Sequence, residues 1–379
     1  MTKVLYISHM REAGGWGQAA RDQILALDAA GVEVVCRNVT LTTDKEISGR
    51  LLELEKRDST GCDVCIQHVL PHHIVGVKGF RKNIAFVETE TTSIKHLAWF
   101  NFLQLVDEVW VPNQQAKDML DDDVLGRPTK VVHHACEIGR YQREHPPIAI
   151  PPAENKFRFY YIGDVNDRKN IESIITSFHA EFEKSDRAIL IFKVNKFGKS
   201  VDEMKPFFDK IIFDVKQKLR IYPSIEGYMK DVTILGDITD DQICALHRYG
   251  DCFMGPSHGE AWSLPAFDAM AFGNTPICSD FGGPAEFIDR QDLYTGALID
   301  GTLTSCKCSD SAFPDMFTAR ECWFTPNEKH IRSMMRFYYE DWKKDPKRSK
   351  RLKQAAGLAR AKQFDYLMIG RQMEVLLNE

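Results

Sequence analysis

Short apolar runs separated by longer amphipathic stretches dominate the first part of the chain. These runs lie at 4–7, 32–35, 64–66, 84–87 and 109–111. Residues 18–28 follow a glycine-rich turn at 14–17 and have apolar positions at helical spacing. Continuous apolar strands that alternate with helices are typical of a parallel sheet with both faces covered.

The same alternation restarts after a proline-rich stretch at 145–155. The later pattern predicts strands at 159–162, 188–192, 232–235 and 276–279, and helices at 171–182 and 242–249. We therefore expect residues 145–155 to be a linker between two doubly wound α/β domains, residues 1–150 and 151–362. Such sheets bind ligands at the carboxyl ends of their strands. Residues 349–377 read as a helix whose basic residues face solvent.

Composition narrows the class of protein. The chain has 379 residues, of which 44% are hydrophobic and 27% charged, as in folded globular proteins. A formal net charge of −5 gives no general attraction to nucleic acid or anionic membranes. Because no apolar run has transmembrane length and the first residues do not resemble a secretory signal, we expect a cytoplasmic protein.

Cysteine and histidine patterns give little support for a metal site. The ten cysteines include no C-x-x-C pair and are expected to be reduced and mostly packed. Cys306, Cys308 and Cys322 lie in a polar region, but Cys-x-Cys alone lacks the usual zinc spacing. The histidine pairs at 72–73 and 133–134 point in different directions on regular structure, so we expect no metal there. His68 or His72 could line an acceptor surface, although an ordinary packed or exposed role is the simpler alternative.

Residues 255–273 carry the most specific chemistry. A strand-like segment at 252–254 enters a loop, Pro265 suits a first helical turn, and Gly273 suits the helix exit. The free amides and dipole of such a helix N-terminus form a seat for a diphosphate. Glu260 and Asp268 flank this seat, and their carboxylates can accept hydrogen bonds from sugar and ribose hydroxyls.

With one acid eight positions after another, this segment resembles the signature of the retaining GT-B glycosyltransferases of family four, the glycosyl transferases group 1. The resemblance implies a GT-B fold, in which two doubly wound Rossmann-like domains face each other across a cleft. Residues 1–150 would form the acceptor side and residues 151–362 would bind the nucleotide sugar. A C-terminal helix at about 363–379 would pack back on the first domain.

The resemblance also assigns roles to single residues. It implies that Glu260 contacts the donor sugar and Asp268 the ribose, and that the amides of Trp262, Ser263 and Leu264 hold phosphate. Lys169 matches the family's phosphate-binding lysine, with Gly163 and Arg168 as neighbouring donor contacts. Lys193, at the end of the next strand, could supply a second cation to the leaving diphosphate. The sequence departs from the family where Ala261 and Ser263 replace glycines, where Asp268 replaces a longer Glu, and where Asp164 replaces a basic residue. Lys169 and Lys193 could instead be ordinary surface charges.

Two features of the first domain complete the candidate site. Residues 14–17 resemble the family's glycine loop, so Gly15, Trp16 and Gly17 are candidate donor contacts, with a plain tight turn as the alternative. Glu88 stands after the fourth strand, where the family commonly has a histidine, and is a candidate catalytic residue.

The resemblance implies transfer of a hexose or pentose from a nucleotide-diphosphate-sugar with retention of configuration, and without a cofactor or metal. The acceptor is open: a lipid, polysaccharide, protein, small molecule or modified nucleic-acid base. One alternative is a phosphorylase or epimerase of the same fold. Another is a non-catalytic nucleotide-sugar sensor or scaffold subunit, which the departures at Asp164 and Asp268 favour.

Overall fold

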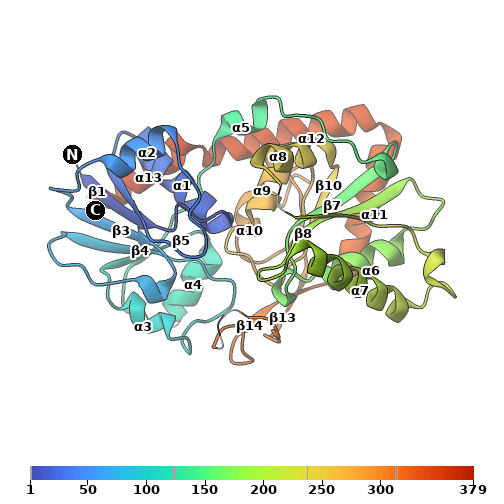
Figure 1. Ribbon diagram of the computed structural model, residues 1–379, viewed down its shortest axis with the longest axis horizontal. Helices are drawn as coiled ribbons and strands as arrows, with labels where there is room; N and C mark the ends of the chain where they lie inside the picture. Colours follow the sequence, from blue (N-terminus) through green and yellow to red (C-terminus); the bar gives the residue numbers. More distant parts are fainter. Residues whose placement is uncertain (1, 123–124, 237, 312, 314) are drawn as a thin grey trace. The chain divides into compact units, whose positions relative to one another are not determined.

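The computed structural model describes residues 2–122, 125–236, 238–311, 313 and 315–379, and these form two compact units. Unit 1 contains Met1–Arg140, Phe313–Cys322 and Ala361–Glu379, and unit 2 contains Tyr141–Ala312 and Trp323–Arg360. Each unit is built on a six-stranded parallel sheet with helices between the strands (Figure 1). The expectation of two doubly wound α/β domains is therefore confirmed.

The sheet of unit 1 has the order β2-β1-β3-β4-β5-β6. Its strands are β1 (Lys3–Ser8), β2 (Glu33–Asn38), β3 (Val64–His68), β4 (Lys82–Phe86), β5 (Glu108–Val111) and β6 (Thr129–Val131). The helices and 3-10 turns of this unit are α1 (Gly15–Ala29), α2 (Gly49–Lys56), η1 (Pro71–His73), α3 (Trp99–Leu103), α4 (Gln114–Asp122), η5 (Lys362–Phe364) and α13 (Tyr366–Asn378).

The sheet of unit 2 has the order β12-β11-β10-β7-β8-β9. Its strands are β7 (Phe157–Asp164), β8 (Ala188–Asn195), β9 (Val232–Leu235), β10 (Cys252–Gly255), β11 (Ile277–Ser279) and β12 (Ala297–Ile299), and β13 (Gly301–Ser305) and β14 (Cys322–Pro326) form a separate two-stranded sheet. The remaining helices are α5 (Ile138–Gln142), η2 (Pro151–Ala153), η3 (Asp167–Lys169), α6 (Ile171–Glu181), α7 (Val201–Leu219), η4 (Ile225–Gly227), α8 (Asp240–Tyr249), α9 (Leu264–Ala271), α10 (Pro284–Phe287), α11 (Glu328–Lys344) and α12 (Pro346–Ala361).

The expected linker at 145–155 is a fixed part of unit 2. The Arg248 guanidinium on α8 donates hydrogen bonds to the carbonyls of Tyr141 (3.3 Å) and Arg143 (2.5 Å). The hydroxyl of Tyr249 donates to the carbonyl of Ile150 at 3.1 Å. These bonds attach residues 141–150 to α8, and unit 2 begins at Tyr141.

Residues 349–377 were expected to be helical with their basic residues facing solvent, and they are divided between two helices. These are α12 and α13, and Asp365 caps α13 by accepting a hydrogen bond from the Tyr366 amide at 2.7 Å. Lys353 is buried, and its ammonium lies 5.3 Å and 5.2 Å from the ring centroids of Phe157 and Tyr338. Its aliphatic stem fills an apolar site, so burial lowers the pKa of Lys353.

Helix α13 packs on α1 within unit 1. The Tyr366 hydroxyl donates to Asp22 at 2.6 Å. Gly370 allows the close approach of the two helices, because a Cβ there would lie 2.0 Å from the carbonyl oxygen of Ala26. Deeply buried Asp22 has a pKa raised to about 6 by desolvation, which outweighs the hydrogen bonds from Tyr366 and Gln18.

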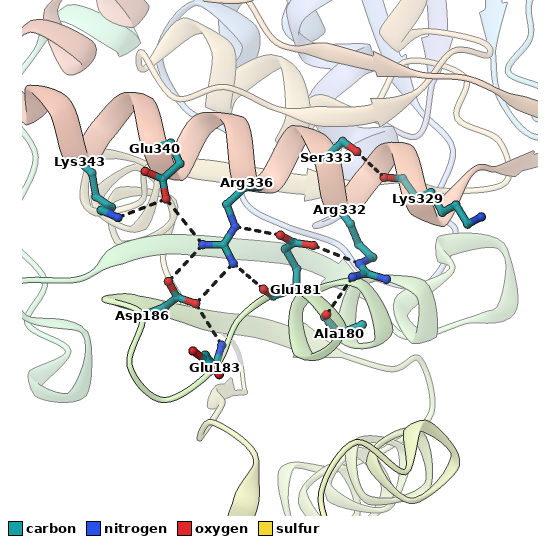
Figure 2. Close-up of polar contacts among 10 residues, drawn as sticks. All are labelled: Ala180, Glu181, Glu183, Asp186, Lys329, Arg332, Ser333, Arg336, Glu340 and Lys343. Atoms are coloured by element: carbon teal, nitrogen blue, oxygen red, sulfur yellow. Dashed lines mark hydrogen bonds and ion pairs between the residues drawn. The ribbon is translucent and has the colours of Figure 1, made fainter.

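An arginine network fixes α11 against α6 in unit 2 (Figure 2). Arg336 bonds the Glu181 carboxylate at 2.9 Å and the Asp186 carboxylate at 3.1 Å, and its guanidinium lies 4.4 Å from the Phe182 ring centroid. Arg332 also bonds Glu181, at 3.2 Å. Two arginines therefore share one carboxylate at the end of α6, close to the aromatic core of this unit.

Among the helices of the described residues, none combines the length and apolarity needed to cross a membrane.

Candidate functional site

The loop between β10 and α9 adopts a tight conformation although Ser263 stands where a glycine was expected. β10 lies between β11 and β7 in the sheet, and α9 begins at Leu264. Ser263 precedes α9 with φ +72° and ψ +68°, in the left-handed region that glycine enters most easily. A serine therefore adopts the conformation at the position where the family resemblance implies a glycine. This backbone conformation costs a non-glycine residue about 1 kcal/mol or more.

Two glycines support this loop from the turn after β11. The Gly283 amide donates to the carbonyl of Glu260 at 2.9 Å. A Cβ at Gly282 would lie 2.3 Å from that same carbonyl oxygen, and one at Gly283 would lie 2.2 Å from the Cα of Trp262. Any larger residue would displace the loop, so Gly282 and Gly283 act through close backbone packing.

The aromatic side chain of the loop is buried, whereas two of its backbone amides have no acceptor among the described residues. Trp262 is 3% exposed and packs against the rings of Phe267 and Phe287. In the described part of the chain, the amides of Ser263 and Leu264 donate no hydrogen bond. The start of α9 thus offers two donors to an anion, as free helix-terminal amides do.

Glu260 lies in an ion cluster with two cations of the β7–α6 connection. Its Oε1 is 2.7 Å from the Lys169 ammonium, and its Oε2 is 3.4 Å from the Arg168 guanidinium. Desolvation alone would raise the pKa of this buried acid, but the charges and hydrogen bonds of Lys169 and Arg168 prevail and lower it. Glu260 is therefore ionised at neutral pH.

The segment that carries these cations is itself bonded to the Glu260 loop. Asn170 adopts φ +53° and donates from its side chain to the Pro256 carbonyl at 2.9 Å. The His258 amide donates to the carbonyl of Arg168 at 2.8 Å. Arg168 also bonds the Gly259 carbonyl at 2.6 Å. The structure therefore brings Glu260, Lys169 and Arg168 together in one rigid arrangement, although 91 residues separate Lys169 from Glu260.

Asp268 has a protein partner that the sequence did not indicate. The hydroxyl of Tyr141, on α5, donates to its Oδ1 at 2.8 Å. Tyr141 is buried, and its ring packs against Phe272 and Phe267. No motif marks Tyr141, because the contact depends on how α5 folds against α9.

Lys193 and Gly163 lie in neighbouring strands of unit 2. Lys193 is a buried residue of β8, two positions before the strand ends, and pairs with Ile162 of β7. Gly163 lies beneath the Tyr161 ring, since a Cβ there would be 2.6 Å from the Tyr161 hydroxyl. These positions place both residues near the carboxyl edge of the sheet, the edge at which Lys169 follows β7.

Glu88, in unit 1, forms a second polar cluster with two histidines. Its Oε1 lies 3.1 Å from Nε2 of His134 and 3.4 Å from Nε2 of His68. Nδ1 of His68 in turn lies 3.0 Å from the Tyr6 hydroxyl. Burial raises the pKa of Glu88, but hydrogen bonds from both imidazoles outweigh burial and lower it. Burial also lowers the pKa of His68, so its neutral imidazole orients an ionised carboxylate.

The glycine-rich turn of unit 1 lies beside this cluster. Gly15, Trp16 and Gly17 form the first turn of α1. A Cβ on Gly17 would lie only 1.9 Å from the Glu12 carbonyl oxygen, which explains the glycine there. The Trp16 ring is 6.1 Å from the ring of His68, centroid to centroid. His68 and His134 were not singled out as partners of Glu88, because the parallel sheet alone brings the ends of their strands together.

The polar cysteine segment has a different arrangement from the three-cysteine group considered in the sequence. Within the described residues, one group could place three ligand atoms within 4.8 Å of one another, and it consists of Asp167, Cys308 and Asp310. Lys196 already binds Asp310 at 2.7 Å, and the Ser309 amide and hydroxyl both bind Asp167 at 2.7 Å. Protein donors therefore already bond both carboxylates and attach this segment to the turn before α6.

Comparisons with known proteins agree with this architecture. Residues 143–305 match the family model described as glycosyl transferases group 1, a segment that contains Lys169, Lys193, Glu260 and Asp268. A comparison with curated protein sequences finds no match.

Solved structures resemble the whole chain. They include sucrose-phosphate synthase from Thermosynechococcus elongatus, with a TM-score of 0.66, 15% identity, and coverage of 100% of this chain and 98% of that one. HepE from Anabaena in complex with UDP has a TM-score of 0.64, 13% identity and full coverage of both chains. A trehalose-6-phosphate structure from E. coli bound with UDP-2-fluoro glucose has a TM-score of 0.65, 11% identity, and coverage of 100% and 99%.

At these identities the likeness establishes the fold. The chain has the GT-B fold, as expected from the sequence. The residues that match the glycosyl transferases group 1 model lie within the second unit.

Proposed function

We propose that the protein is a glycosyltransferase that moves a sugar from a nucleotide-diphosphate-sugar to an acceptor with retention of anomeric configuration. The cluster of Glu260, Lys169 and Arg168, beside the N-terminus of α9 and inside the group 1 segment, carries this proposal. The relative HepE is described in complexes with UDP and with UDP-glucose, which supports UDP-sugars as the first donors to test.

The candidate site residues of unit 2 have separate roles in this proposal. Glu260 accepts a hydrogen bond from the transferred sugar, and Asp268 accepts one from the ribose. Lys169, Arg168 and Lys193 stabilise the negative charge that develops on the leaving diphosphate, together with the amides at the start of α9. These fixed positive charges take the part that a divalent cation plays in other transferases, so the proposed reaction needs no metal.

The proposed reaction proceeds on one face of the sugar. The bond from the anomeric carbon to the diphosphate oxygen breaks, and the acceptor oxygen bonds that carbon from the same side. The leaving phosphate oxygen takes the acceptor proton, so no protein nucleophile is needed. In unit 1, the ionised carboxylate of Glu88 is proposed to bind a sugar hydroxyl, with Gly15, Trp16 and Gly17 nearby.

A donor screen tests the proposed function. Thermal unfolding is measured with UDP-, GDP- and ADP-sugars, because a ligand that binds the folded state raises the unfolding temperature by mass action. Donors that bind are then assayed for hydrolysis and transfer in excess chelator. Absence of stabilisation by every donor would refute the proposal. Activity lost to chelator and restored by magnesium or manganese would refute its metal-independent part.

The Tyr141–Asp268 hydrogen bond favours one second candidate, a non-catalytic nucleotide-sugar sensor or scaffold subunit. A carboxylate that already accepts a bond from the protein is a less available partner for ribose. Tight donor binding without hydrolysis or transfer across an acceptor panel would support the sensor. Product analysis with and without acceptor separates a transferase from a phosphorylase or epimerase.

A further inference from the structure

Unit 2 contains a cavity that is separate from the proposed donor contacts. Its volume is about 280 Å³, just below the usual range for small-molecule sites. Its walls come from the turn before α6, from α7, from the 307–310 segment and from the start of β14, and they include Asp167, Lys196, Phe207, His258, Asp310 and Trp323. Glu260, Asp268 and Lys193 are not among the described residues that line it.

The polar wall of this cavity is held in place by several hydrogen bonds. The Asp167 amide donates to Asp310 at 3.2 Å, and Asp167 accepts both bonds of Ser309. The Lys196 ammonium bonds Asp310 at 2.7 Å and the Val165 carbonyl at 2.8 Å. These contacts fix the 307–310 segment against the turn, so donors and acceptors line one wall in defined positions.

Aromatic rings form another part of the lining. The imidazole of His258 stacks on Trp323 with a centroid distance of 4.4 Å and an interplanar angle of 12°. Nδ1 of His258 is bonded to the Phe324 carbonyl at 2.7 Å, which fixes the orientation of the ring. Phe207 adds a further ring, 5.6 Å from the Lys196 ammonium. The cavity thus combines flat apolar surfaces with polar groups.

The charges of the lining decide between ligand classes. Three acids, Asp167, Glu172 and Asp310, stand against two lysines, Lys196 and Lys307. The slight excess of negative charge disfavours a phosphate or carboxylate ligand. A sugar ring has C–H faces for the aromatic surfaces and hydroxyls that both donate and accept, which matches the mixed lining. We propose that this cavity is a binding site for a neutral sugar ring, independent of the nucleotide donor.

The cavity is connected to the Glu260 cluster through shared backbone. Asp167 directly precedes Arg168 and Lys169, and Asn170, which also lines the cavity, directly follows them. His258 lies two residues before Glu260, and its amide bonds the carbonyl of Arg168. A sugar in the cavity would therefore stabilise one arrangement of the turn that positions the Lys169–Glu260 ion pair.

Saturation-transfer difference NMR of the full chain without nucleotide tests the site directly. The probes are glucose, galactose, mannose and N-acetylglucosamine at millimolar concentration. Ile211→Trp fills the cavity from α7, and Phe213→Trp is the matched control, because Phe213 is on the same helix but 48% exposed and outside the lining. We expect saturation transfer to at least one sugar in the parent and in Phe213→Trp, and its loss in Ile211→Trp.

A milder variant covers the case in which Ile211→Trp does not fold. Lys307 is exposed, so Lys307→Ala should leave the unfolding temperature unchanged. It should lower the affinity for the sugar roughly two- to tenfold, which corresponds to the loss of one hydrogen bond. No transfer to any sugar, transfer unchanged in both lining variants, or transfer abolished by free UDP would overturn the proposal. Two results without sugar binding would also overturn it: manganese that broadens only resonances of the cavity residues, or added phosphate that shifts only those resonances. A failure to bind nucleotide would refute the proposed function and leave this site intact.

Discussion

The two acids of the β10–α9 loop should respond differently to loss of charge. Glu260 bonds Lys169 at 2.7 Å and Arg168 at 3.4 Å, with only 10% of its side chain exposed. Glu260→Gln replaces two ion pairs with weaker hydrogen bonds from the same two cations to a neutral amide oxygen, a loss of about 1–2 kcal/mol in stability. It also leaves the two cations without their counterion, so affinity for free nucleoside diphosphate should not fall. Turnover should fall at least tenfold, or about 1.4 kcal/mol, because a charge beside the transferred sugar is lost.

Asp268→Asn should lower the affinity of the protein for the nucleoside diphosphate itself. A hydrogen bond from ribose to an ionised acceptor is worth about 1.5–3 kcal/mol, or roughly ten- to a hundredfold in affinity. The Tyr141 hydroxyl can still donate to the amide oxygen of Asn, so the fold should be kept. Asp268→Glu is the matched control and should retain nucleotide binding, because it keeps the charge.

Calorimetric titration of the nucleoside diphosphate into the three variants, with turnover measured on the same samples, decides the matter. The assignment is wrong if Glu260→Gln loses nucleotide affinity as severely as Asp268→Asn. It is also wrong if neither variant differs from the parent in affinity or rate.

Three further predictions concern other charged residues. Lys193→Met should lower the affinity for the donor about ten- to a hundredfold, because it removes a charge proposed to contact the diphosphate. An unchanged affinity would show that Lys193 is not part of the site. Asp22 has a pKa raised to about 6, so this group binds more protons in the folded than in the unfolded state between about pH 4 and 6, and its contribution to stability falls as pH rises through that window. Asp22→Asn removes this negative contribution, so the slope of stability against pH in urea unfolding should become more positive than in the parent, and an unchanged slope would contradict the role of Asp22. Arg336→Ala should cost about 1–3 kcal/mol of stability, whereas Lys343→Ala, at an exposed pair, should cost less than about 0.5; equal losses would contradict the network of Figure 2.

The fold could be predicted largely because its strands are buried on both faces. Residues 188–194 of β8 are all buried, and five of them form the apolar run seen in the sequence. β13 is exposed at every position and has no such pattern, so it was not predicted. Lys353 was expected to face solvent because a lysine counts as charged in a sequence pattern. In the structure its apolar stem packs near two aromatic rings.

The candidate site was only partly predictable for a related reason. Motif spacing marked Glu260 and Lys169 separately, but their ion pair joins positions 91 residues apart. The histidines beside Glu88 come from the ends of other strands, and Tyr141 comes from a short helix. Their importance depends on tertiary contacts, and local sequence does not record those contacts.

Ser263 tests whether the unusual loop conformation is a requirement of the fold. At φ +72° a serine is strained by about 1–2 kcal/mol relative to the right-handed region. Ser263→Gly removes that strain but increases the entropy of the unfolded chain, so stability should change by less than about 1 kcal/mol and nucleotide affinity should be kept. Ser263→Val should lose at least about 1 kcal/mol and weaken the nucleotide, because a β-branched residue resists this conformation and would shift the amides at the start of α9. Thermal unfolding and calorimetric titration of both variants measure the two effects. If Val is tolerated as well as Gly, the left-handed turn is not needed, and the diphosphate does not bind to these amides.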